Sequence, residues 1–284
     1  MKKLSFILAA AMIMLAACNK QTDNTDKRLT FVISNEWEGS DTIPFRACTD
    51  DGLSANGSAM TDLWVFDYVD DDLQQQLHQT PTDSDWGTPS MTLTYGTHHL
   101  YFVASRGNSP SLDTDDHIIS WTKASDTFFY HLSLTVNPST PDSQPLTLLR
   151  VCGKLKMTLN DAIPSGVTSF VITPHTWYTS LDYLTGNPSA PVTDQNITVS
   201  CPSSMWGLSG QFLTIYSLSS TTEWTTDVTL TATDGSNTYG QATLSNVPML
   251  RNRSSEYSGN LFTFGSEFTL SLNDSWDDPY NGGW

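Results

Sequence analysis

The chain has 284 residues, with 13 Lys plus Arg against 30 Asp plus Glu and a formal net charge of −17. This balance excludes a nucleic-acid partner, because a phosphate-reading surface needs clustered basic side chains. Twenty-five of the acids are Asp and only five are Glu, while Thr and Ser number 38 and 34, a composition that suits strands and turns and excludes helical bundles, coiled coils and doubly wound α/β enzymes.

The first segment has the features of a lipoprotein signal peptide. Two lysines precede an apolar stretch, residues 4–14, which is too short to span a bilayer as a permanent helix. Residues 15–18, Leu-Ala-Ala-Cys, form a lipoprotein box, and acyl chains on the Cys18 thiol would hold the protein on a membrane at about 0.8 kcal/mol per buried methylene. We expect cleavage after residue 17 and a lipidated polar tether over residues 18–27. Residue 19 is Asn and not Asp, which favours the outer membrane.

Alternation of apolar and polar residues with a period of two is the strongest structural signal. Together with continuous apolar runs, it predicts strands, in chain order, at residues 63–68, 100–104, 128–136, 154–159, 212–216, 228–233 and 268–272. Residues 70–79 could form one or two helical turns, and Asp234-Gly235 predicts a hairpin turn. Strands at this spacing, separated by turn residues, indicate β-sandwiches.

A polar segment with three prolines, residues 137–145, follows the longest alternating strand. Such a cluster of turn residues predicts a domain boundary. We therefore expect an N-terminal sandwich over residues 28–145 and a C-terminal sandwich over residues 146–284, each of ordinary size for one domain.

Residues that carry chemistry occur without the spacing that catalysis or metal binding needs. His98 and His99 are neighbours on a predicted strand, so their side chains point to opposite faces. His117 follows two aspartates and fits a solvated turn, and residues 70–72, three aspartates, lack the alternating acids and glycine of a calcium loop. No nucleophile, phosphate-loop or zinc-protease motif is present. We expect no catalytic residue, no metal site and no cofactor.

Cysteine and tryptophan are assigned to structural roles. Three cysteines remain once Cys18 is acylated, and one pair among them could form a disulfide: Cys48, Cys152 and Cys201. Cys152 lies in a strand pattern and is expected to be a small buried residue. Three tryptophans in apolar contexts are expected to pack in the core: Trp64, Trp177 and Trp206.

Several short segments, in order along most of the mature chain, follow the pattern of a known family. They are residues 29–34, Arg46-Ala47, 62–67, 99–104, 126–130, 148–151, 162–167, 247–254, 259, 261–262 and 268–272. Together with the lipoprotein box, these segments resemble fimbrillin-type lipoproteins, the subunits of fimbriae in Gram-negative anaerobes. The segments at 126–130, 148–151 and 162–167 are most similar to the anchor and accessory branch.

The resemblance implies an all-β fold of two tandem transthyretin-like β-sandwich domains after a cleaved lipoprotein signal peptide, and no catalysis. In polymerising members a protease cuts after an arginine in the early loop, the first strand leaves, and a strand of the next subunit fills the vacated groove. Arg46, followed by Ala47, lies where that cut would fall, although it could equally be a loop arginine that nothing cuts. Arg28, in the expected tether, is a weaker candidate.

Anchor subunits keep their first strand and their lipid, so lipid on Cys18 is expected to matter more than cleavage at Arg46. The expected partners are other fimbrial subunits and the outer membrane, at the cell surface. Arg251 and Arg253 near strand ends are expected to stabilise turns or an interdomain contact. The alternative is a surface lipoprotein that binds glycans through exposed aromatic residues.

Overall fold

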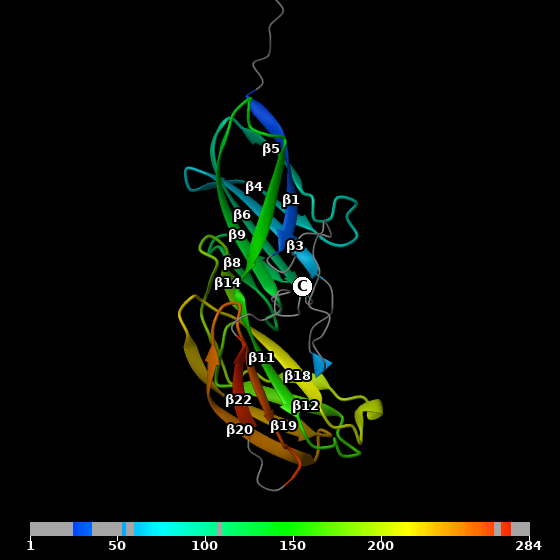
Figure 1. Cartoon of the computed structure of the whole chain (residues 1–284). Helices are drawn as coiled ribbons and strands as arrows, with labels where there is room; N and C mark the ends of the chain where they lie inside the picture. The colour runs from blue at the N-terminus through cyan, green and yellow to red at the C-terminus, as the bar shows by residue number, and fades with distance from the viewer. Residues whose placement is uncertain (1–24, 36–52, 55–59, 107–109, 264–267, 274–284) are drawn as a thin grey trace, which may run out of the picture.

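The regular structure of this chain is β-strand almost throughout. The computed structural model describes residues 25–35, 53–54, 60–106, 110–263 and 268–273. Within these ranges the one helical segment is a short 3-10 turn, η1 (Ser203–Met205). The molecule is elongated, with the early strands at one end and the late strands at the other (Figure 1). The expected all-β class is confirmed.

The early strands form a seven-stranded sheet in the order β4-β3-β6-β9-β10-β1-β5. Their bounds are β1 (Asp26–Asn35), β3 (Met60–Val69), β4 (Asp72–Gln79), β5 (Ser90–Thr94), β6 (Gly96–Arg106), β9 (Thr127–Val136) and β10 (Ser143–Arg150). β10 changes partner along its length, because residues 143–148 pair with β1 and residues 149–150 pair with β9. The sheet folds over there, so that Phe31 of β1 meets Phe102 of β6 with ring centroids 5.2 Å apart.

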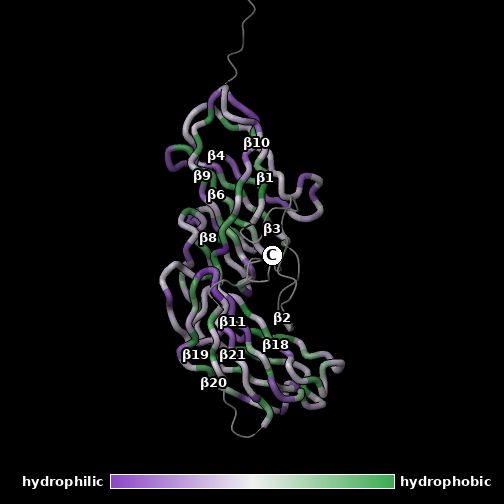
Figure 2. Tube along the Cα trace, viewed as in Figure 1, coloured by the Kyte–Doolittle hydropathy of each residue, from purple (hydrophilic) through white to green (hydrophobic). Residues whose placement is uncertain are grey.

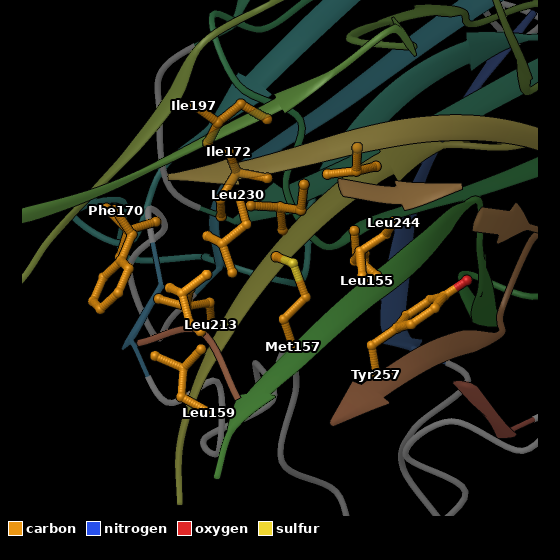
Figure 3. Close-up of a cluster of buried hydrophobic side chains, with 14 of the residues drawn as sticks. Leu155, Met157, Leu159, Phe170, Ile172, Ile197, Leu213, Leu230, Leu244 and Tyr257 are labelled. Atoms are coloured by element: carbon orange, nitrogen blue, oxygen red, sulfur yellow. The ribbon is translucent and has the colours of Figure 1, made fainter. Parts of the chain in front are cut away.

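The late strands form two sheets that face each other. One has the order β2-β18-β11-β21-β22 and the other β17-β12-β19-β20. Their bounds are β2 (Leu53–Ser54), β11 (Cys152–Leu159), β12 (Ser169–Pro174), β17 (Ile197–Ser200), β18 (Gln211–Leu218), β19 (Trp224–Thr233), β20 (Thr238–Met249), β21 (Ser254–Gly259) and β22 (Phe268–Asn273). Inward side chains of both sheets interdigitate in one core, as Figure 3 shows for Leu155, Met157, Phe170 and Leu230. Green hydrophobic stretches mark the strands at both ends of the molecule (Figure 2).

A fourth sheet contains strands from both parts of the chain, with the order β15-β14-β8-β7. It is formed by β7 (Ser111–Asp113), β8 (Ile118–Ser120), β14 (Ser180–Asp182) and β15 (Asn187–Pro188), and a small separate sheet pairs β13 (Thr176–Trp177) with β16 (Val192–Thr193). β8 and β14 lie between the two ends of the molecule (Figure 1). A mixed core accompanies this sheet, where Phe66 stacks on Tyr183 with centroids 4.0 Å apart. The two ends are therefore joined by backbone hydrogen bonds as well as by the chain.

Each predicted strand lies inside an observed one. The matches, in chain order, are to β3, β6, β9, β11, β18, β19 and β22. The hairpin at Asp234-Gly235 is also confirmed, because Thr233 pairs with Thr238 across it and Gly235 has a φ of 92°. The alternation was informative because each of these strands presents at least one face to a core.

The predicted helical turns at residues 70–79 were wrong. Asp70 and Asp71 have φ values of 51° and 68°, and Val69 pairs with Asp72. Positive φ at both central residues is the geometry of a two-residue hairpin turn, which aspartate tolerates. The chain therefore returns as β4, paired along β3, and the three aspartates form the tip of a hairpin.

The expected boundary segment partly belongs to a strand. Residues 143–145, placed in the polar segment, open β10, where Pro145 pairs with Val32 of β1. β10 contains the expected boundary at residue 146, and the whole of this strand belongs to the seven-stranded sheet. A division of the chain into two domains stays a prediction, and the sheet pairing would favour a boundary after Arg150.

The predictions for tryptophan and cysteine had mixed outcomes. Trp177 is fully buried, whereas Trp206 is 37% exposed, so its assignment to the core was wrong. The indole nitrogen of Trp206 donates to the Val167 carbonyl at 2.8 Å, and the ring lies over the surface. Cys152 and Cys201 are buried and free, so neither forms a disulfide. Cys48 lies outside the described residues.

Candidate functional site

The first strand, β1, occupies an interior position in the seven-stranded sheet. It pairs in parallel with β10, from Thr30 opposite Ser143 onward, and antiparallel with β5 over residues 26–30. Beyond β5, the Phe31 and Ile33 amides donate to the carbonyls of Pro89 and Gly87 at 2.9 and 3.1 Å. Both edges of β1 are thus hydrogen-bonded. We call the position between β10 and β5 the β1 slot.

The inward face of β1 is apolar and completely covered. Leu29, Phe31 and Ile33 are 0, 0 and 1% exposed, whereas Val32, on the outer face, is 43% exposed. Burying three such side chains contributes about 5 to 9 kcal/mol before the cost of ordering the strand. An empty slot would expose the core surface that these side chains cover and two rows of unpaired backbone groups.

A lysine side chain holds the start of β1 in place. Lys27 forms an ion pair with Asp142 at 2.9 Å and donates to the Pro138 carbonyl at 3.2 Å and to the Thr140 carbonyl. These acceptors lie in the turn between β9 and β10. Asp142 is largely exposed, so the ion pair itself adds little stability, and the contact mainly sets where the strand begins.

Both neighbours of β1, the strands β5 and β10, are held to the rest of the sheet by side-chain hydrogen bonds and ion pairs. On the β5 side, His98 places Nδ1 2.6 Å from Asp67 Oδ1 and Nε2 2.9 Å from the Thr94 carbonyl, and Gln75 donates to the Thr92 carbonyl at 2.9 Å. His98 and Asp67 are both buried. β5 is short, so these contacts from β3, β4 and β6 hold it in place against β1.

On the β10 side, a buried charge pair fixes the end of the strand. Arg150 donates from Nε and Nη2 to the two carboxylate oxygens of Asp126 at 2.7 and 3.1 Å, and from Nη1 to Asn252 at 3.1 Å. Burial by itself would raise the pKa of Asp126, but the Arg150 guanidinium, helped by Arg106 and Lys154, lowers it below its usual value. Such a two-point pair is strong because it is planar and desolvated on both sides.

The predicted site residues have unequal outcomes. Cys18, Arg46 and Ala47 lie outside the described residues, so lipidation and processing there stay predictions. Arg28 was expected in a flexible tether, but it lies within β1, opposite Thr92 of β5. The expected tether of residues 18–27 was wrong at its last two positions, because β1 begins at Asp26.

The carboxy-terminal arginines have the structural role expected of them. Arg251 donates to the carbonyls of Ser219 and Gly186 at 3.2 and 2.5 Å, and Arg253 is hydrogen-bonded to Glu223. Gly186 lies in the β14–β15 turn against Phe129 of β9, where a Cβ would come within 2.4 Å of the ring. Arg251 therefore stabilises the turn that touches the early strands.

Sequence patterns did not predict the two side-chain pairs that hold the neighbours of β1 in place. Asp126 and Arg150 are 24 positions apart and His98 and Asp67 are 31 apart, so nothing local pairs them. The sequence feature that could have indicated these pairs was a charged residue within each apolar stretch.

Among the described residues no group of three or more His, Cys, Asp or Glu side chains is arranged to hold a metal ion. Nor does any helix in those ranges reach the length and apolarity needed to cross a membrane.

Solved structures from Porphyromonas gingivalis and Parabacteroides distasonis match the chain at low sequence identity. The tip fimbrial protein Mfa3 from Porphyromonas gingivalis is 12% identical with a TM-score of 0.47, covering 87% of this chain and 100% of that one. A fimbrial assembly protein from Parabacteroides distasonis is 10% identical with a TM-score of 0.44, covering 87% and 99%. At this level of similarity the likeness assigns no function to the chain.

Comparison by sequence gives a family. No curated protein matches the chain. A family model described as "Family of unknown function (DUF6562)" matches residues 92–284, about two thirds of the sequence. The match begins within β5 and covers β6, β9 and β10 of the seven-stranded sheet and all of the late strands except β2. The other strands of the seven-stranded sheet, β1, β3 and β4, precede it. The chain therefore belongs to the DUF6562 family.

Proposed function

We propose that the protein is a non-catalytic lipoprotein of the cell surface, an anchor or accessory subunit of a fimbria-like adhesive filament, assembled by β-strand complementation. The observation that carries this proposal is the β1 slot. A strand near the N-terminus, joined to the rest of the chain through the segment that contains Arg46, completes a sheet whose other members need it. A strand of the same pattern from another subunit would make the same ladder bonds and bury the same core.

The tether supports a role close to the membrane. The start of β1 at Asp26 lies eight positions after Cys18, and a fully extended chain spans at most about 3.5 Å per residue. Lipid on Cys18 would therefore keep the start of β1 within roughly 28 Å of the bilayer. In the folded chain β1 fills its own slot, as expected for a subunit that stays at the base.

The proposal is tested on isolated surface filaments. Filaments sheared from cells and washed free of membrane should contain this chain, detected by mass spectrometry, and cells with Cys18→Ala should release it into the medium. Absence of the chain from purified filaments would overturn the assignment to a fimbria.

The anchor role is tested at the N-terminus. Edman sequencing of the surface protein should give a blocked N-terminus, because an acylated Cys18 cannot be degraded. A free N-terminus at Ala47 would instead show cleavage after Arg46 and support a polymerising stalk role.

Glycan binding remains the alternative function, and no feature of the described surface favours it. The described aromatic residues that are more than a third exposed are Tyr95, between β5 and β6, and Trp206, after η1. They belong to opposite groups of strands and form no shared stacking platform. A polysaccharide array probed with the protein lacking Cys18 should give no signal, and saturable binding that Trp206→Ala abolishes would favour the alternative.

A further inference from the structure

Two histidines of neighbouring interior strands meet on the surface of the seven-stranded sheet. His99 of β6 lies opposite Ser133 of β9, and His131 lies opposite Tyr101, so the two histidines are diagonal neighbours. His99 Nδ1 is 3.1 Å from His131 Nε2. His99 is half-buried and His131 is exposed, so the pair is open to solvent.

The other four histidines have their ring nitrogens next to oxygen partners. His78, His98 and His175 lie beside carboxylates at 2.9, 2.6 and 3.0 Å, and His117 lies beside the Tyr68 and Tyr183 hydroxyls. Only in the pair of His99 and His131 do two imidazole nitrogens face each other. One of them must carry a proton to make that contact, and the other offers a lone pair.

A neighbouring aromatic ring fixes the orientation of His131 in this pair. Tyr101 stacks on the His131 ring with centroids 4.5 Å apart and planes 8° apart.

We propose that His99 and His131 form a binding site for a late first-row divalent metal ion such as Zn²⁺, in which the ion replaces the proton between the two nitrogens. Neutral imidazole is a preferred ligand of these ions. Two nitrogens on one tetrahedral zinc, each at about 2.05 Å, lie roughly 3.3 Å apart. The observed separation therefore needs only a small opening of the pair.

Two protein ligands leave the remaining positions to water. The described residues supply no third His, Cys, Asp or Glu ligand, so we expect a weaker affinity than that of a site with three or four protein ligands. The bound ion would cross-link β6 and β9, the two strands at the centre of the seven-stranded sheet. Binding would not need any conformational change of the backbone. The site is separate from the β1 slot and does not depend on strand complementation.

The test uses the full chain, purified without a histidine tag and stripped with a chelator. Isothermal titration with ZnCl₂ should give one saturable site, and His99→Gln or His131→Gln should weaken it by at least about tenfold. His175→Gln is the matched control, because that residue is an exposed histidine with one carboxylate neighbour, and it should leave the affinity unchanged. Electron paramagnetic resonance of the Cu²⁺-loaded protein should show coupling to two nitrogens.

Both variants replace surface side chains, so they should fold, and their unfolding midpoints without metal should match that of the unsubstituted protein. Three outcomes would overturn the proposal. They are no binding of Zn²⁺ up to millimolar concentration, an affinity in both His99→Gln and His131→Gln equal to that of the unsubstituted protein, or loss of binding in His175→Gln alone.

Discussion

The first and last described strands of the chain are opposites in their packing. β1 lies inside its sheet, bonded on both edges, with its three inward apolar side chains almost fully covered. β22 is the outermost strand of its sheet and pairs only with β21, and its Leu270 and Leu272 are 40 and 45% exposed. Both strands show the same alternation in the sequence. The difference shows that pattern identifies a strand, whereas its neighbours decide how much stability it contributes.

The largest expected effect comes from removing β1. A chain that starts at Ala47 should lose about 5 to 9 kcal/mol of apolar burial, which is comparable to the whole stability of a typical domain. Urea unfolding followed by tryptophan fluorescence should show no cooperative transition for the early strands. Adding a peptide of residues 26–35 should restore it, and the same peptide with Leu29, Phe31 and Ile33 replaced by Ser should not. A truncated chain as stable as the full one would remove the basis of the β1 slot.

A single substitution in β1 should have the next largest effect. Phe31→Ala leaves a cavity against Phe102 and should lower the free energy of unfolding by about 3 to 5 kcal/mol. The measurement is the urea midpoint at constant slope. Val32→Ala on the exposed face of the same strand is the matched control and should change the midpoint little. Equal effects at the two positions would show that β1 does not pack as described.

The pair that holds β10 should matter to a similar or slightly smaller degree. Asp126→Asn leaves Arg150 buried without its countercharge and should cost about 3 kcal/mol. Because the pKa of Asp126 is lowered in the folded state, its contribution is complete above the unfolded value of about 3.9 and is lost as the pH falls through the lower folded value. The unsubstituted protein should therefore lose stability in acid more steeply than Asp126→Asn. Parallel acid titrations would contradict this role.

The smallest effect is expected in β22. Leu272→Thr removes a side chain that is nearly half exposed and should change the free energy of unfolding by about 0.5 kcal/mol or less. The unfolding temperatures of Leu272→Thr and Phe31→Ala, measured side by side, compare the contributions of β22 and β1 to stability directly. A loss of several kcal/mol at Leu272 would mean that the β22 edge is covered in solution.

Much of the fold could be predicted because alternation is a local property. The strands at residues 128–136 and 154–159 followed directly from period two, and so did the hairpin after Thr233. The turn at Asp70 and Asp71 could not, because an acidic run fits a helix start and a hairpin tip equally well, and the choice rests on pairing with β3. Trp206 was misassigned because an apolar neighbourhood in sequence does not say which side of the chain faces the core.

The candidate site was predicted only in part for the same reason. A first strand followed by a loop with Arg46 could be read from the residues. The position of that strand between β10 and β5 depends on contacts more than 100 and about 60 positions away. The shared sheet of β8 and β14, which joins the two ends of the molecule, had no local signal in its three-residue strands.

The sequence by itself determined the all-β class, the spacing of the strands and the acidic, turn-rich surface, since these depend on residue type and periodicity. Only the tertiary structure decided which strands are indispensable. Side chains distant along the chain, such as Asp126 and Arg150 or His99 and His131, acquire their roles when the sheet brings them within 3.1 Å of each other. Burial and pairing are properties of neighbours in space, and alternation in one strand does not name those neighbours.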